Sequence, residues 1–290
     1  MKRTQCYCCC GQLALVSNSS VVEVAQCPGC GSLLTEFPKS ERHEDDPWQL
    51  QSVTPTFLEA LRLRRDRQAG AIIKRFGLEL RKGKLLDYGC GQGAFVLYAR
   101  GQGLDAAGCD ISSINLKPEI ADSFVALSEP WEIPDLSAVR TISFLDVLEH
   151  VEHPDQIVDK LFASGVENVL IKVPMLHGPI GLIAHTLARF GKLGLLHRLL
   201  LVDEPAPHYS FFTSKGLKKL FEERGFVLAD SVRIADVGSE LPQRLRGMEG
   251  EPSLSASQII TKSLGSALAL IAPLWSDTRV FLFRRSASPK

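Results

Sequence analysis

The sequence predicts an α/β domain built on a parallel sheet, with a small cysteine-rich module ahead of it. Three observations support this prediction. Strand-like and helix-like segments alternate from Gly83 onward, as in βαβ units. A short strand at 84–88 leads directly into three glycines at alternate positions and then into a helix. The first 38 residues hold six of the eight cysteines, and most of these form C-x-x-C pairs.

Composition narrows the class of protein. The chain has 290 residues, a formal net charge of zero and 45% apolar residues, so it can bury a full core. Balanced charge gives no global attraction to nucleic acid or to anionic membranes. The first residues lead into cysteines instead of an apolar run, and no apolar stretch has the length of a membrane-spanning helix. We therefore expect a cytoplasmic protein whose paired cysteines are reduced metal ligands.

Residues 1–38 predict a zinc ribbon. Four cysteines form two C-x-x-C knuckles that can surround one Zn²⁺ tetrahedrally: Cys6, Cys9, Cys27 and Cys30. The metal would supply folding energy that so short a segment cannot obtain from a core. Segments 13–16 and 21–25 are the expected strands. Cys8 and Cys10 leave the ligand register of the first knuckle open, and a redox or fortuitous cysteine cluster is the alternative interpretation.

The rest of the chain divides into a polar linker at 39–53 and an α/β domain at 54–286. Apolar spacing predicts helices at 55–76, 94–102, 154–163 and 213–224. The expected strands are 84–88, 105–109, 140–145, 168–173, 226–234 and 278–284. Two apolar regions interrupt the alternation: an insert at 176–202 with scattered cationic residues, and a segment containing a buried helix at about 264–274.

One acid and a glycine turn, followed by a second acid, predict a cofactor site. The residues are Asp87, Gly89, Gly91, Gly93 and Asp110. Glycines remove side chains where a ligand must pass, and an acid at the end of the second strand can accept hydrogen bonds from both ribose hydroxyls. An NAD enzyme is the competing interpretation. The acid just before the glycines and the tight G-C-G-Q-G spacing both argue against it.

At these residues the chain resembles the class I S-adenosylmethionine (SAM)-dependent methyltransferases. The resemblance rests on segments 85–93, 108–110, 144–151 and 208–226 and covers about residues 54–286. It implies a Rossmann-like seven-stranded sheet, with Asp87 and the glycine turn on the methionine part of SAM and Asp110 on its ribose. It further implies that Ser128 or Glu129 lies near the adenine. Asp146 begins the segment that usually helps to form the methyl-transfer site.

The motif Asp146-x-x-Glu149-His150 resembles one found in quinone-precursor O-methyltransferases and in small-RNA terminal 2′-O-methyltransferases. In both branches such residues bind a divalent cation, and two carboxylates with an imidazole suit Mg²⁺, Mn²⁺ or Zn²⁺. His208 is a candidate fourth ligand. The alternative is that these side chains shape the pocket without metal, with His150 or His208 as a base for an alcohol or phenol nucleophile.

The expected reaction is methyl transfer from SAM to a small-molecule, glycan or lipid-linked acceptor, most readily at a hydroxyl oxygen. The alternatives are an RNA methyltransferase, acting on ribosomal RNA or on a terminal 2′-oxygen, and a non-catalytic SAM-binding adaptor. Neutral charge weakens the nucleic-acid alternative. The insert at 176–202 predicts a lid over the substrate or, as the second interpretation, a peripheral contact with a membrane surface. Nothing in the sequence indicates the oligomeric state.

Overall fold

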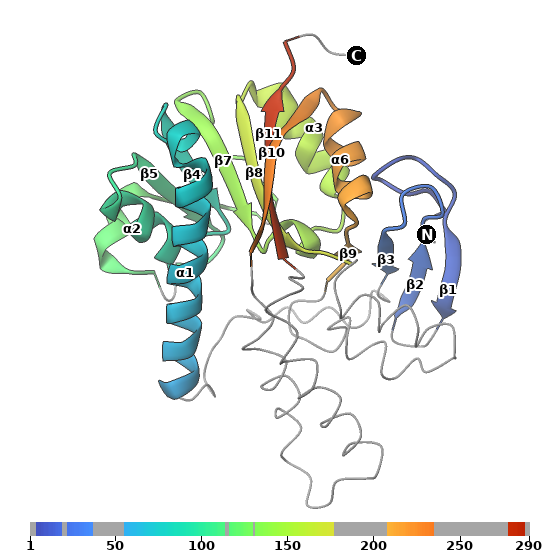
Figure 1. The fold of residues 1–290 in the computed structure, drawn as a ribbon, viewed down its shortest axis with the longest axis horizontal. Helices are drawn as coiled ribbons and strands as arrows, with labels where there is room; N and C mark the ends of the chain where they lie inside the picture. Colours follow the sequence, from blue (N-terminus) through green and yellow to red (C-terminus); the bar gives the residue numbers. More distant parts are fainter. Residues whose placement is uncertain are drawn as a thin grey trace, which may run out of the picture.

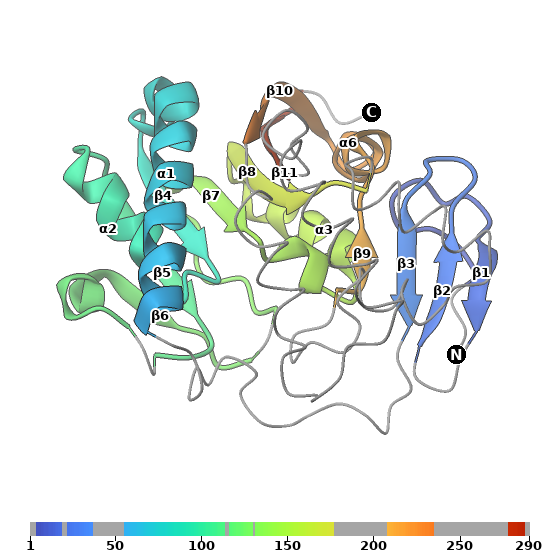
Figure 2. The same ribbon diagram turned by 60° about the horizontal axis from the view of Figure 1, so that its bottom comes forward.

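The computed structural model describes residues 4–18, 22–36, 55–113, 116–129, 131–176, 208–234 and 278–287. In these residues the strands form two sheets, one of seven strands and one of four. Figures 1 and 2 show the smaller sheet beside the larger α/β unit, on the side where α6 lies. The predicted linker at 39–53, residues 177–202 of the insert and the expected helix at 264–274 lie outside the described residues.

The larger sheet has the strand order β10-β11-β8-β7-β4-β5-β6. Its strands are β4 (Lys84–Tyr88), β5 (Ala106–Asp110), β6 (Phe124–Ala126), β7 (Val139–Leu145), β8 (Asn168–Pro174), β10 (Phe226–Ile234) and β11 (Thr278–Arg285). From β8 to β6 neighbouring strands are parallel, whereas β11 is antiparallel to both β8 and β10. The carboxyl ends of β4, β5 and β7 therefore meet at one edge, where open α/β sheets bind ligands.

Both faces of the sheet are buried, by two separate hydrophobic cores. The helical segments are α1 (Pro55–Leu80), α2 (Ala94–Gly101), η2 (Pro118–Ser123), η3 (Leu148–His150), α3 (Pro154–Ser164) and α6 (Ser214–Glu222). Leu85 of β4 packs in the core that contains residues of α1 and α2. Leu86, the next residue, packs in the core that contains residues of α3 and α6. This follows from the period-2 alternation of side chains along a strand.

The smaller sheet joins the N-terminal segment of the chain to an internal segment that precedes α6. It consists of β1 (Ala14–Asn18), β2 (Glu23–Gln26), β3 (Leu33–Glu36) and β9 (Ser210–Phe211), all antiparallel. Strand β9 pairs through Leu33 with Phe211 and through Leu34 with Ser210. Neither β3 nor β9 was predicted from the sequence. The ribbon is thus completed by a strand that precedes α6, more than 170 residues further along the chain.

Most predicted elements are present with boundaries shifted by a few residues. The first helix continues to Leu80, and the helix expected at 213–224 begins at Ser214 because Thr213 is its N-cap. Thr213 accepts a hydrogen bond from the Gly216 amide at 2.9 Å. In the part of the chain that the structure describes, no helix is both long and apolar enough to cross a membrane.

Candidate functional site

The glycine turn between β4 and α2 has the conformation that the sequence predicts. Gly89, Gly91 and Gly93 have φ angles of 69°, 53° and 77°, which cost other residues roughly 1–2 kcal/mol each. A Cβ on Gly93 would lie 1.9 Å from Ile120 Cδ1, and one on Gly89 would lie 2.7 Å from a Val147 methyl. A Cβ on Gly91 would meet nothing within 4 Å. Packing therefore requires Gly89 and Gly93, while Gly91 borders open space.

Asp110, the last residue of β5, holds this turn. Its Oδ2 accepts a hydrogen bond from the Gly91 amide at 2.8 Å, and its Oδ1 accepts one from the Ser112 amide at 3.1 Å. The carboxylate is therefore fixed beside the open side of the turn. The sequence predicted the position of this acid but not its contact with Gly91.

Asp87 lies under the turn and is buried, with only 4% of its surface exposed. Its Oδ1 accepts a hydrogen bond from the Ser143 hydroxyl at 2.7 Å. The pKa of Asp87 is raised from 3.8 to about 7, chiefly by burial; the nearby charges of Asp110 and Asp146 add to the rise, and the hydrogen bond from Ser143 opposes it. Ser143, a residue that the sequence did not single out, thus stabilises the charged form of Asp87.

Asp146 follows β7 with a φ of 59°, an unusual backbone angle for a residue other than glycine. It forms an ion pair with Lys172 of β8, whose side chain is buried and also donates to Gln68 Oε1 at 2.6 Å. The negative charge of Asp146 is therefore paired with the positive charge of Lys172. Lys172 was missed, although a single lysine in the apolar strand 168–174 is a signal, because a buried ammonium group requires a partner.

Glu149, His150 and His208 lie together at the end of β7. One ligand atom from each lies within 4.8 Å of the others, and the two imidazole rings are 4.5 Å apart in an edge-to-face arrangement. Glu149 and His150 belong to η3, and His208 precedes β9. His208 therefore completes the cluster in place of Asp146, which the sequence grouped with Glu149 and His150.

Glu149 is the buried member of this cluster, with 1% of its surface exposed. Its Oε2 atom has no hydrogen-bond partner in the described residues. Burial raises the pKa of Glu149 well above 4.5, and the charge of Asp146 raises it as well. The positive charge of Lys172 acts in the opposite direction and favours the ionised carboxylate.

Glu129, the residue predicted to lie near the adenine, is exposed. It lines a surface pocket with Trp131, Glu132 and Lys160 among others, and Asp87, Asp110 and Asp146 are not part of that lining. Its predicted contact with the cofactor stays a prediction. The Leu127 amide, two residues earlier, donates to the Asp110 carbonyl oxygen at 2.9 Å.

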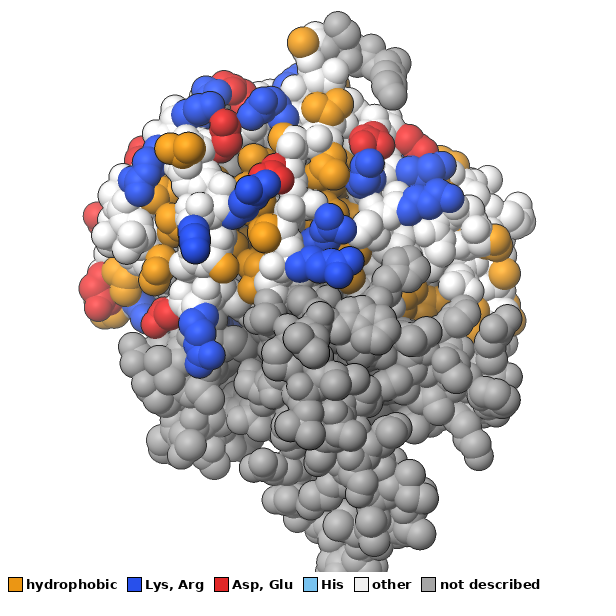
Figure 3. Space-filling view, in the orientation of Figure 1, with side chains coloured by type: hydrophobic (Ala, Val, Ile, Leu, Met, Phe, Trp, Pro, Cys, Tyr) orange, Lys and Arg blue, Asp and Glu red, His pale blue; other side chains and the backbone are white. Residues whose placement is uncertain are grey.

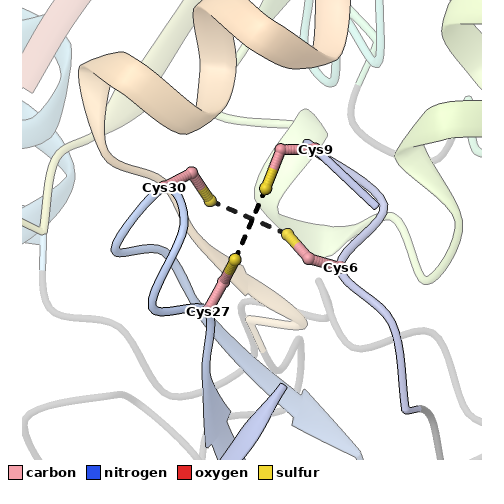
Figure 4. Close-up of side chains that lie close together, drawn as sticks. All are labelled: Cys6, Cys9, Cys27 and Cys30. Carbon is pink, nitrogen blue, oxygen red and sulfur yellow. Dashed lines mark hydrogen bonds between the residues drawn. The ribbon is translucent and has the colours of Figure 1, made fainter. Parts of the chain in front are cut away.

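The four predicted zinc ligands converge from two loops (Figure 4). Their Sγ atoms all lie within 4.8 Å of one another, with 3.7 Å between Cys6 and Cys30 and 3.4 Å between Cys9 and Cys27. Tetrahedral Zn–S bonds of about 2.3 Å would place the sulfurs roughly 3.8 Å apart. The donor set and its dimensions therefore fit a zinc ion.

The backbone also decides between the two possible registers of the first knuckle. The Cys10 amide donates to the Cys6 carbonyl at 2.7 Å, and the Gly31 amide donates to the Cys27 carbonyl at the same distance. Cys10 has a φ of 54° and Gly31 a φ of 80°. Cys10 is thus the counterpart of Gly31, which leaves Cys9 as the counterpart of Cys30. The exposed Cys10 is not a member of the four-sulfur cluster.

Comparison with solved structures supports the same architecture. The chain is similar to phosphoethanolamine N-methyltransferase 2 of Haemonchus contortus in complex with S-adenosyl-L-methionine, with TM-score 0.53, 17% identity and coverage of 88% of this chain and 63% of that one. It is also similar to magnesium protoporphyrin IX methyltransferase of Synechocystis PCC 6803 with bound SAH, with TM-score 0.50, 13% identity and coverage of 81% and 90%. At these identities the likeness concerns the fold.

Comparison of the sequence with curated proteins found no match. A family model described as a methyltransferase domain does match, over residues 61–231. That range is more than half of the 290 residues and contains the glycine turn, the three acids at the strand ends and the Glu149–His150–His208 cluster. The chain therefore belongs to the methyltransferase domain family.

Proposed function

We propose that the chain transfers a methyl group from SAM to a hydroxyl oxygen of a small-molecule, glycan or lipid-linked acceptor. One observation carries the proposal: His208 meets Glu149 and His150 at the end of β7, a strand that pairs in parallel with β4, which in turn pairs with β5. Asp146 joins these two groups electrostatically, because its charge acts on both Asp87 and Glu149. Cofactor-binding and acceptor-binding residues then share one site.

The cofactor half consists of Asp87, the glycine turn and Asp110. SAM supplies a methyl group on a sulfonium, already activated for transfer. Bound SAM is cationic at its sulfonium and its amino group, and an edge that carries Asp87, Asp110 and Asp146 favours cations. The open space at Gly91 and the fixed carboxylate of Asp110 support binding of the ribose here.

The acceptor half consists of His150 and His208 with Glu149 behind them. A hydroxyl becomes a better nucleophile as its proton is removed, and an imidazole is the side chain best suited to accept that proton near neutral pH. Holding the acceptor oxygen in line with the methyl group is the other requirement. The edge-to-face contact of the two rings supports a defined position for both imidazoles.

The same three side chains also fit a divalent cation. The buried Glu149 Oε2 lacks a hydrogen-bond partner in the described residues, and a carboxylate with two imidazoles suits Zn²⁺ or Mn²⁺. A cation would hold Glu149 ionised and polarise an acceptor hydroxyl. Activity measured after chelation and then with added Mg²⁺, Mn²⁺ or Zn²⁺ distinguishes a metal-assisted site from a histidine base alone.

In the ribbon, the four cysteines are proposed to hold one structural Zn²⁺. Four thiolates closing a tetrahedron leave no open coordination position, which is typical of structural sites and not of catalytic ones. Native mass spectrometry of the purified protein measures the zinc content directly. Replacement of Cys9 by Ser should abolish it, whereas replacement of Cys10 should not.

An RNA acceptor is the less favoured alternative. Phosphate binding requires an excess of Lys and Arg on one surface. The chain has 33 basic and 33 acidic residues, and both signs are interspersed over the described part of the face in Figure 3. If nuclease treatment of the labelled product released the methyl label, the RNA alternative would replace the small-molecule proposal.

Methyl transfer from isotopically labelled SAM into fractionated host extract tests the proposed reaction. We expect the wild-type protein to label a nuclease-resistant fraction, and the double variant His150→Ala/His208→Ala to lose that labelling while it still binds SAM by calorimetry. The ¹³C chemical shift of the transferred methyl group distinguishes an O-methyl from an N- or S-methyl product. Full labelling by the double variant, or an N-methyl product, would contradict the proposal. Binding of NAD in place of SAM would contradict its first step.

A further inference from the structure

We infer that the zinc ribbon is a positioning element for the acceptor half of the active site, acting through Thr35 on His208. The inference rests on the proposed function, in which His208 faces the acceptor. It assigns the ribbon a role inside the catalytic domain instead of a separate role as a binding module for a partner. Thr35 is the positioning residue.

Strand β3 contacts the backbone at His208 and Tyr209. The Thr35 hydroxyl donates to the His208 carbonyl at 2.5 Å, and the Thr35 amide donates to the Tyr209 carbonyl at 3.1 Å. On the other side, the Tyr209 amide donates to the Glu149 carbonyl at 2.8 Å. The segment that carries His208 is therefore held between the ribbon and η3, at the residue that brings its ring to His150.

Both C-x-x-C knuckles form hydrogen bonds with residues that follow His208. From the first knuckle, the Tyr7 hydroxyl forms a hydrogen bond with the Ser210 hydroxyl. From the second, the Cys30 carbonyl accepts from the Thr213 hydroxyl at 2.6 Å. The Thr213 amide donates to the Ser32 hydroxyl at 3.2 Å. Ordering of the two knuckles by zinc would therefore order the whole stretch from His208 to Thr213.

The ribbon and the α/β domain share one hydrophobic core. Cys6, Cys27 and Cys30 belong to the same hydrophobic cluster as Phe212 and Leu217. A Cβ on Gly216, in the first turn of α6, would lie 2.2 Å from Ser32 Oγ and 3.3 Å from Cys30 Sγ. The positive end of the α6 dipole thus lies against the thiolate cluster, which favours its negative charge. Packing this close leaves the ribbon no freedom to move as an independent module.

The histidine signals of the full-length protein, selectively labelled with ¹³C-histidine, test the inference by NMR. The signal of His208 is assigned by its loss in His208→Gln. We expect Thr35→Val to shift the His208 and His150 signals, because it removes the hydrogen bond to the His208 carbonyl while nearly preserving side-chain volume. Thr35→Ser, which retains the hydroxyl, should restore the wild-type positions. Cys30→Ser, which removes a sulfur from the ribbon cluster and leaves the histidine cluster unchanged, should shift the same two signals.

Thr141→Val is the matched control. It removes a buried hydroxyl from the far end of β7 and should leave the His208 signal in place. SAM affinity should stay within about twofold of wild type in Thr35→Val, as expected for sites that do not share partners. The inference is overturned if Thr35→Val leaves the His208 signal unmoved, or if Thr141→Val moves it equally. The NMR measurement requires no acceptor. If the protein methylated no hydroxyl, the proposed function would therefore be wrong, but the NMR result on Thr35 and His208 would still stand.

Discussion

The residues proposed to hold SAM come from one continuous stretch, 84–110, whereas those proposed to face the acceptor come from segments almost 60 residues apart. In the first region, a strand, a turn and the next strand deliver Asp87, the glycines and Asp110 to one sheet edge. In the second, His208 lies beside Glu149 and His150 and precedes β9, which pairs with β3 of the smaller sheet.

Binding of the cofactor and recognition of the acceptor are therefore expected to depend on different parts of the chain. The cofactor region depends on local backbone geometry and on the central strands of the sheet. The acceptor region makes long-range contacts, among them the hydrogen bonds from the Thr35 hydroxyl to the His208 carbonyl and from the Thr213 hydroxyl to the Cys30 carbonyl. Damage to the ribbon should therefore affect the second region much more than the first.

The largest expected effect is that of a broken zinc site. Cys30→Ser removes one of the four ligands, so the protein should lose its zinc and its methyl transfer should fall by at least about tenfold. SAM affinity should change far less, because the glycine turn is held by β4 and β5. Zinc content by mass spectrometry and SAM binding by calorimetry are the measurements. Cys10→Ser is the control and should keep the metal. If Cys30→Ser reduced SAM affinity and methyl transfer equally, the expected difference between the cofactor region and the acceptor region would be wrong.

The second effect concerns the glycine turn. Gly93→Ala places a Cβ against Ile120 in a left-handed backbone, which should destabilise the protein by about 2–4 kcal/mol and weaken SAM binding more than tenfold. Gly101→Ala, at the end of α2, adds a Cβ that meets nothing within 4 Å and should be neutral or slightly stabilising. Denaturant unfolding and calorimetry test both variants. Wild-type SAM affinity in Gly93→Ala would contradict the close packing behind the turn.

The third effect is a pH dependence of the cofactor region. The pKa of Asp87 is raised to about 7, chiefly by burial. Between about pH 4 and pH 7 the folded state therefore binds more protons than the unfolded state, so the free energy of unfolding falls as pH rises, by up to about 4 kcal/mol, and levels off above pH 7. Denaturant unfolding across this range should show the slope, and Asp87→Asn should reduce it to the part that the raised pKa of Glu149 contributes.

The same titration predicts the pH dependence of SAM binding. A cationic ligand favours ionised Asp87, so the affinity for SAM should weaken as pH falls below about 7, by up to tenfold per pH unit. Calorimetry at a series of pH values measures it, with Asp87→Asn as the variant that should bind weakly without this dependence. If the affinity of the wild-type protein for SAM did not change with pH, the cationic groups of SAM would not lie near Asp87.

The smallest effect is a gain in stability at the first knuckle. Cys10→Gly relieves a left-handed backbone worth roughly 1–2 kcal/mol and costs roughly 0.5–1 kcal/mol of chain entropy, so we expect a net stabilisation of about 0.5–1 kcal/mol with zinc retained. Gly31→Ala, the mirror change in the second knuckle, should destabilise. Thermal unfolding of the zinc-loaded proteins measures both. Loss of zinc in Cys10→Gly would show that the sulfur of Cys10 belongs to the site after all.

Local patterns predicted the elements that depend on local physics. The strand–turn–helix at 84–101 is encoded by an apolar strand and three glycines, and the four cysteines by their C-x-x-C spacing. Strand β9 was missed because it has two residues and pairs only with β3, far away in the chain. Strand β3 was missed because it has only four residues, although it pairs with the neighbouring β2 as well as with β9. Lys172 was missed because its significance depends on Asp146, which only the parallel register of β7 and β8 brings opposite it.

The sequence by itself determined the family of folds, the cofactor edge and the four-cysteine cluster, because each depends on residues that are neighbours or follow a fixed spacing. Only the tertiary structure decided that the sulfur of Cys9 and not that of Cys10 lies beside Cys27, that Lys172 pairs with Asp146, and that His208 joins Glu149 and His150. These contacts join residues that are far apart in the sequence. The pattern of one segment does not identify its partner, because the two come together only when the chain folds. For the same reason, the ribbon that looks like a separate module in the sequence shares a hydrophobic core with the α/β domain in the fold.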